Sequence, residues 1–303
     1  VYKRQALALL AGKPPREQEK EWQRLRLNLM LGLMDTFYFQ HRAADMAAMK
    51  DRLEILLEEV GTLKQKSDYY ARLGQIAFLK NQYFLPLEQF DLVQQSLSYA
   101  QQSGNQLLIA RVYFHAGFHN LWYQNLAEAA QFLDRALETA AVMSDTWLVL
   151  QCQVYLSLVY RMQGAIQKLS ACLPELMANA QEIDYVSYLG VGQSGQAWLR
   201  YQVGDWAQAE ELAQAALASW RKMAYPIQWP AQLVLLATAL HGWRIEAGVA
   251  AAHALLDPAH QQLPEKITEL LRKALARWDR GEKRQTEEAL LRAVELAKAY
   301  GYL

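Results

Sequence analysis

Two histidines four positions apart are the first residues of this sequence whose types and spacing could do chemistry. His115 and His119 would share one face of a helix, and this spacing lets two histidines ligate the same metal ion. An HExxH site needs Glu at position 116, where Ala116 stands, and no nearby carboxylate or cysteine motif supplies a third ligand. We therefore expect no metal here and interpret the pair as structural or groove-lining.

A glycine-rich segment is the second candidate. Gly190, Gly192 and Gly195 spell GxGxxG, which binds dinucleotides when it follows a buried strand, opens a helix and precedes an acidic residue by about 20 positions. Residues 184–189 fit the start of a helix instead, and Asp205 comes too early. The glycines indicate close helix packing or a local helix break.

Catalytic motifs are missing from the sequence. No nucleophile elbow, paired-carboxylate site or GxxxxGKS/T phosphate loop occurs in the 303 residues. We therefore predict neither a cofactor nor an enzyme activity for this segment.

Composition excludes further classes of protein. The 31 Lys and Arg balance 31 Asp and Glu, so the sequence offers no basic face for nucleic acid. The apolar runs are far shorter than the roughly 20 residues of a membrane span. Cys152 and Cys172 lie in apolar helical patterns and indicate reduced, buried thiols, for which a cytoplasmic setting is expected.

The elements that must position any site are helices repeated along the chain. The segments between turns have apolar residues three and four apart, with Ala, Leu, Gln, Glu, Arg and Lys throughout. Equivalent small or apolar residues recur every 40 positions at Ala129, Leu169 and Ala209, and the same step reaches Val249 and Ala289. The step also places His253, Leu256, Ala293 and Leu296 at the later equivalent positions. Each unit should be a helical hairpin that is stabilised by stacking on its neighbours.

The two ends of the chain are expected to be less regular. Residues 1–16 read as a tail or the last helix of a preceding domain, with a boundary at Pro14 and Pro15. Residues 17–303 form the repeat domain, with a degenerate first unit around Met49 and Leu53 and a capping last unit. Because the sequence begins with Val1 and lacks a signal-peptide pattern, we interpret it as a piece of a longer protein.

One unit carries a recognisable motif. Gly204-Asp205-Trp206-Ala207-Gln208-Ala209, followed by Ala213 and Ala216-Leu217, resembles the second helix of the tetratricopeptide repeat (TPR). Leu73-Gly74 and Ala116-Gly117 resemble the Leu-Gly pair of its first helix, and the resemblance covers about residues 65–220. The period is nearer 40 than the usual 34, which long helices and longer connections would explain. Armadillo-like or HEAT-like pairing is the alternative, since its period also lies near 40.

The resemblance implies a fold and a setting. The fold is an all-α, right-handed superhelical solenoid of about seven helical hairpins. The Ala- and Leu-rich units, ending with residues 281–301, are similar to the helical arrays that lie C-terminal to bacterial signalling ATPases, among them regulators of the maltose-activator type and ATPase-coupled nucleotide cyclases. In such parents the array senses a ligand or partner and controls an output domain.

First helices line the concave face in the TPR family, and this implies a set of groove residues. Arg beside aromatic rings suits a peptide or an acidic terminus. The candidates are Gln75, Phe78, Arg111, Phe114, Phe118, Trp122, Arg161, Trp198 and Tyr201. Aromatic stripes at helical spacing are also typical of a core, so the two arginines discriminate. Exposed and convergent arginines would favour ligand capture, and arginines paired with local carboxylates would be merely solvated.

The expected function is a regulatory module that binds a protein, a peptide, another domain of the parent chain or a small ligand in its groove. Arg111→Ala or Trp122→Ala should then abolish capture while melting stays nearly unchanged. The alternative is a structural scaffold or dimerisation array with an empty groove. The sequence names neither the partner nor the oligomeric state.

Overall fold

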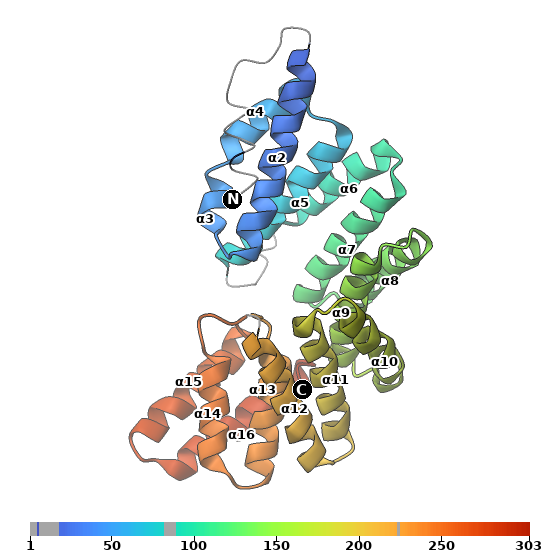
Figure 1. Cartoon of the computed structure of the whole chain (residues 1–303). Coiled ribbons are helices and arrows are strands. Elements are labelled where there is room, and N and C mark those ends of the chain that lie inside the picture. Colours follow the sequence, from blue (N-terminus) through green and yellow to red (C-terminus); the bar gives the residue numbers. More distant parts are fainter. Residues whose placement is uncertain (1–4, 6–17, 82–88, 223–224) are drawn as a thin grey trace.

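A computed structural model describes residues 5, 18–81, 89–222 and 225–303 (Figure 1). These residues form α-helices with no strand among them. The helices are α2 (Glu19–Phe39), α3 (Ala43–Ala47), α4 (Lys50–Val60), α5 (Leu63–Lys80), α6 (Phe90–Ser103), α7 (Gln106–Trp122), α8 (Leu126–Val142), α9 (Thr146–Met162), α10 (Ile166–Glu182), α11 (Val186–Gln202), α12 (Trp206–Lys222), α13 (Trp229–His241), α14 (Ile245–Leu255), α15 (Glu265–Asp279) and α16 (Lys283–Ala299). Apart from Gln5, the predicted tail of residues 1–16 lies outside the described residues.

Consecutive helices pack as hairpins, and the hairpins stack into one array. From α5 to α14 the hairpins are α5–α6, α7–α8, α9–α10, α11–α12 and α13–α14, while α2 with α4 and α15 with α16 form the ends. The prediction of an all-α solenoid of helical hairpins is confirmed. Each described helix is too short or too polar to cross a membrane.

The period of 40 arises from a half-repeat of 20 residues. Helices α7 to α12 have 17 residues each and are joined by three-residue connections. Each connection contains one residue with positive φ, and Gly104 occupies the same place before α7. These residues are Gly104, Gln124, Ser144, Gly164, Asp184 and Gly204, spaced 20 apart. The expectation of longer connections was wrong, because the helices alone lengthen the unit.

The residues aligned at 40-residue steps are buried on second helices. Ala129, Leu169 and Ala209 have no exposed surface, and Val249 and Ala289 are nearly as buried. The prediction for one later position was wrong, because His253 is exposed. The short helix α14 turns Ala252 and Leu255 inward instead.

Successive first helices pack against one another, as α5 does on α7, α7 on α9, α9 on α11 and α11 on α13. The array bends around these helices, so that α2 and α5 lie across from α12 and α13 (Figure 1). The inner surface of the bend therefore carries the side chains of these first helices.

Close approach within a hairpin needs small residues. At Gly117 of α7, a Cβ would lie 2.6 Å from Cγ of Leu133 on α8.

Candidate functional site

The inner surface contains a cavity of about 320 Å³, which we call the aromatic cavity. Its walls come from the end of α2, from α5, α7, α9 and α11, and from the connection between α12 and α13. The lining residues are Tyr38, Phe39, His41, Gly74, Gln75, Phe78, Leu79, Phe114, His115, Phe118, His119, Gln151, Tyr155, Tyr185, Tyr188, Tyr225, Pro226 and Ile227. Segments almost 190 positions apart in the sequence thus enclose one space.

Edge-to-face aromatic contacts hold the wall in place. The ring of Phe118 meets the rings of Phe78 and Tyr155 at centroid distances of 4.9 and 4.8 Å, both nearly perpendicular. The Tyr185 and Tyr188 rings, which also line the cavity, lie 4.6 Å apart. Such pairs fix ring orientation and contribute about 0.5–1.5 kcal/mol each beyond burial. The cavity is therefore preorganised.

The polar groups of the aromatic cavity are amides, phenols and imidazoles. Among the described residues no Lys, Arg, Asp or Glu lines it. Burial lowers the pKa of His115 to about 4 and that of His119 to about 3, so both imidazoles are neutral at pH 7. Oε1 of Gln75 and Nδ1 of His119 are buried and have no hydrogen-bond partner within the described part of the protein. Buried polar atoms without partners are rare in native structures and point to a missing ligand or water.

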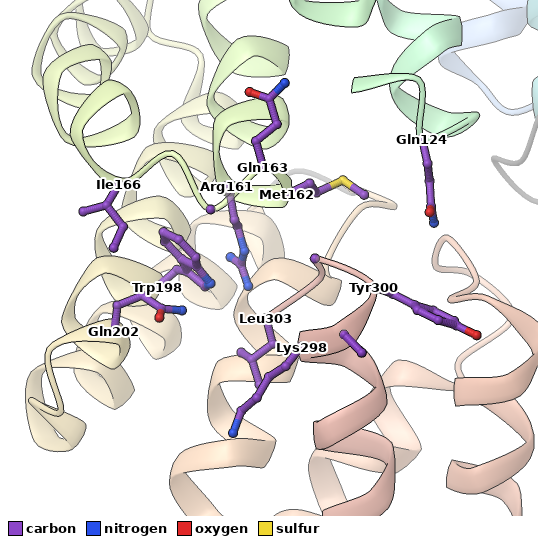
Figure 2. Close-up of a pocket in the computed structure, with 13 residues that line it drawn as sticks. Gln124, Arg161, Met162, Gln163, Ile166, Trp198, Gln202, Lys298, Tyr300 and Leu303 are labelled. Atoms are coloured by element: carbon purple, nitrogen blue, oxygen red, sulfur yellow. The ribbon is translucent and has the colours of Figure 1, made fainter. Parts of the chain in front are cut away.

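A second space, of about 510 Å³, lies at the C-terminal ends of α9, α11 and α16, and we call it the arginine pocket (Figure 2). Its lining residues are Gln124, Arg161, Met162, Gln163, Gly164, Ile166, Trp198, Gln202, Lys298, Ala299, Tyr300, Gly301 and Leu303. Figure 2 shows the Arg161 side chain descending between Trp198 and the last residues of the chain. Polar groups dominate this lining, in contrast to the aromatic cavity.

Arg161 is only 2% exposed and ties the C-terminal segment to the array. Nη2 donates to the carbonyl of Tyr302 at 3.1 Å, and Nη1 donates to the carbonyl of Ser194 at 3.4 Å. The guanidinium also lies 5.2 Å from the Trp229 ring and 5.9 Å from the Trp198 ring. Gly301, with φ of +74°, sits so close to the Met162 carbonyl that a Cβ would clash with it. The C-terminal residues are therefore packed against the inner surface.

The predicted groove residues divide among four environments. Gln75, Phe78, Phe114 and Phe118 come together in the aromatic cavity, and Arg161 and Trp198 come together in the arginine pocket. Arg111 lines neither space: its side chain is 52% exposed and Nη2 lies 3.1 Å from Oδ2 of Asp145. Because it is exposed and paired with a local carboxylate, Arg111 fits the description of a solvated arginine. Trp122 and Tyr201 belong to the hydrophobic core and line neither space.

Half of the aromatic cavity could not be found from the repeat pattern. Tyr155 of α9 and Tyr188 of α11 lie more than one helical turn before Arg161 and Trp198, the candidates predicted on those helices. Tyr185 directly precedes α11. Tyr38 and Tyr225 come from outside the matched units, so only the bend of the array brings them to the cavity. The groove-lining interpretation of His115 and His119 agrees with their place in the wall.

The three glycines of the GxGxxG motif have a structural role. Gly190, Gly192 and Gly195 lie within α11, where a Cβ would collide with Trp220, Met177 and Leu173 respectively. The glycines therefore serve close helix packing. In the part of the chain that the structure describes, no three His, Cys, Asp or Glu side chains gather as a metal site. Both cysteines are free, with Cys152 buried and Cys172 partly buried.

Comparisons with known proteins give a likeness in fold. No family model and no curated protein matches the sequence. Among solved structures, the chain is similar to a Signal Transduction ATPase with Numerous Domains (STAND) protein with a tetratricopeptide repeat sensor from Pyrococcus horikoshii, with a TM-score of 0.55 and 15% identity. The match covers 77% of this chain and 36% of that one, so this chain spans about a third of the length of its neighbour. The chain has the fold of a TPR-like helical array.

Proposed function

We propose that this chain is a ligand-sensing regulatory module that binds an uncharged small molecule in the aromatic cavity. The observation that carries the proposal is a preformed cavity, lined by aromatic rings and neutral polar groups, in which buried polar atoms of Gln75 and His119 lack partners. Ligand sites are typically concave and mostly apolar, with a few polar groups that orient the ligand. The size of about 320 Å³ suits a small molecule better than a folded partner.

The chemistry of the walls defines the ligand class. Phe and Tyr rings offer flat apolar surfaces, which favour a ligand with a planar or apolar face. The two glutamines of the lining, together with neutral His115 and His119, offer donors and acceptors without charge. A carboxylate or phosphate would lose its hydration there and find no Lys or Arg in the described lining, which costs several kcal/mol or more. The ligand is therefore neutral, with hydroxyl or amide groups along one edge.

The placement of the cavity suggests how binding is reported. Tyr38 and Tyr225 lie on parts of the array that are far apart in the sequence. A ligand that contacts both would therefore favour the conformation in which these two parts lie close together. A ligand shifts a conformational equilibrium by its difference in affinity for the two states. In the STAND neighbour the tetratricopeptide repeats form a sensor. By analogy, this array would control an output domain of a larger signalling protein, with a protein partner as the receiver of the signal.

A scaffold without a ligand is the alternative function. Its support is the continuous core that runs through the stacked hairpins. A scaffold would require no preformed cavity and would leave the polar atoms of Gln75 and His119 to water.

Binding of a matched pair of probes tests the proposal. Benzyl alcohol and benzoate have the same ring and differ in charge, and ligand-observed NMR measures the binding of each. We expect saturable binding of benzyl alcohol and at least about ten-fold weaker binding of benzoate, a difference of about 1.4 kcal/mol. Equal binding of both probes, or binding of neither, would contradict the proposal.

Two variants locate the probe. Gln75→Leu keeps the size of a side chain that lines the cavity and removes its unpartnered carbonyl, so it should weaken benzyl alcohol binding. Gln102→Leu, on the exposed side of α6, is the matched control and should bind the probe as the parent chain does. Equal behaviour of the two variants would place the probe elsewhere.

A further inference from the structure

The arginine pocket holds a buried cation, Arg161, with no acidic side chain in the described lining. No Asp or Glu side chain lies within ion-pairing distance of Arg161 among the described residues, and Nε has no hydrogen-bond partner. Burial alone lowers the pKa of Arg161 to about 9, which leaves the guanidinium charged at pH 7. A buried charge normally has a partner, because desolvation of an unpaired ion costs several kcal/mol.

The contacts of Arg161 with its surroundings compensate this charge only in part. The two carbonyl acceptors take two of its five N–H groups, and the longer of these bonds measures 3.4 Å. The tryptophan rings add cation–π attraction but no counter-charge. The carbonyl groups and the rings stabilise the guanidinium, but none of them carries a negative charge.

The pocket next to Arg161 gathers further donors. Nε1 of Trp198 is buried without a partner, and the amides of Gln124 and Gln202 lie on the same lining. Lys298 also lines the pocket, although its ammonium is already 2.9 Å from Glu295. Among the described residues the lining contains two cations and no Asp or Glu side chain. Donors, positive charge and open volume therefore coincide.

We propose that the arginine pocket is a binding site for an oxyanion, carried as a carboxylate or phosphate group on a small molecule, with Arg161 as the principal contact. The planar guanidinium matches the two oxygens of either group. The volume of about 510 Å³ leaves room for an organic part beside Trp198. This site is separate from the aromatic cavity and takes ligands of the opposite polarity, so its test does not depend on the function proposed above.

The experiment follows the Arg161 Nε–H signal in a ¹⁵N NMR spectrum, assigned by its loss in Arg161→Lys, while inorganic phosphate, succinate or sodium chloride is added at equal ionic strength. We expect a saturable shift with phosphate, with succinate or with both, and no saturable shift with chloride. A response to phosphate alone assigns a phosphorylated ligand, and a response to succinate alone assigns a carboxylic acid. A flat response to both oxyanions, or an equal response to chloride, would overturn the proposal. Because Leu303 lines the pocket, the titration is repeated with a Gly-Ser extension after it, which keeps a terminal carboxylate away from Arg161.

Two substitutions at exposed positions test the proposal without disturbing the core. Gln202→Glu introduces a carboxylate from an exposed position of the lining and should weaken oxyanion binding about ten-fold or more by competing for Arg161. Gln208→Glu, exposed on α12 and outside the lining, is the charge-matched control and should bind as the parent chain does. Unchanged binding in Gln202→Glu, with the fold confirmed by circular dichroism, would also overturn the proposal.

Discussion

Gly117→Ala tests whether the hairpin that carries the aromatic wall is held together by close helix approach. Gly117 lies in α7, the helix that bears Phe114 and Phe118, and it faces α8. An added Cβ would lie 2.6 Å from Cγ of Leu133 and 3.0 Å from the carbonyl oxygen of Ala129. Neither atom is the free end of a flexible side chain, so the two helices must separate.

The size of the effect follows from two opposing terms. Alanine in place of glycine within a helix gains about 1 kcal/mol, whereas overpacking a tight contact costs about 1–3 kcal/mol. We expect Gly117→Ala to lower the free energy of unfolding by about 1 kcal/mol. The matched control is Gly248→Ala in α14, where the nearest atoms to a Cβ lie at 3.4–3.7 Å, ordinary contact distances. That variant should raise the free energy of unfolding by about 1 kcal/mol, since it gains helix propensity without a clash.

Urea denaturation followed by circular dichroism compares the two variants, and hydrogen exchange localises the change. Because each hairpin in a repeat array contacts only its neighbours, lost protection should concentrate in α7 and α8. Stabilisation by Gly117→Ala equal to that by Gly248→Ala would refute the close approach of α7 and α8.

The remaining predictions concern pH and single side chains. As the pH falls below 6.5, the unfolded chain protonates its histidines before the folded chain protonates His115 or His119. The free energy of unfolding should therefore fall by up to about 1.4 kcal/mol per pH unit for each of these two histidines, and it should stay level above pH 7. Urea midpoints from pH 7.5 to 4.5 check this prediction, and an equal slope in the His115→Asn, His119→Asn double variant would contradict it. Arg111→Ala removes an exposed ion pair and should change the free energy of unfolding by less than about 1 kcal/mol. Trp122→Ala empties a core position and should cost about 3–5 kcal/mol, and melting curves with the reverse order would contradict both assignments.

The sequence was sufficient to predict the stacked hairpins because their signal is local and repeated. The 40-residue step at Ala129, Leu169 and Ala209 marks the buried face of three second helices, and a period needs no knowledge of distant contacts. The same step failed at His253, since α14 is shorter than the helices from which the step was derived.

The candidate site was predictable only where it belongs to the regular units. Phe78, Phe114 and Phe118 lie on the first helices α5 and α7, so the family pattern reached them. Tyr38 and Tyr225 enter the cavity through the overall bend of the array, which accumulates from small rotations between hairpins and leaves no mark on a single repeat. Helical spacing also could not separate Trp122 from its neighbour Phe118, because a turn of helix presents both the core and the inner surface.

Nuclear Overhauser effects between bound benzyl alcohol and the tyrosine rings test most directly the claim that the bent array encloses a ligand site. Spectra of chain with ¹³C-labelled tyrosine, assigned by Tyr38→Phe and Tyr225→Phe, would report which rings the probe contacts. We expect contacts to both Tyr38 and Tyr225, which come from parts of the array far apart in the sequence. Contacts to neither ring, or only to tyrosines outside the cavity such as Tyr300, would contradict the claim.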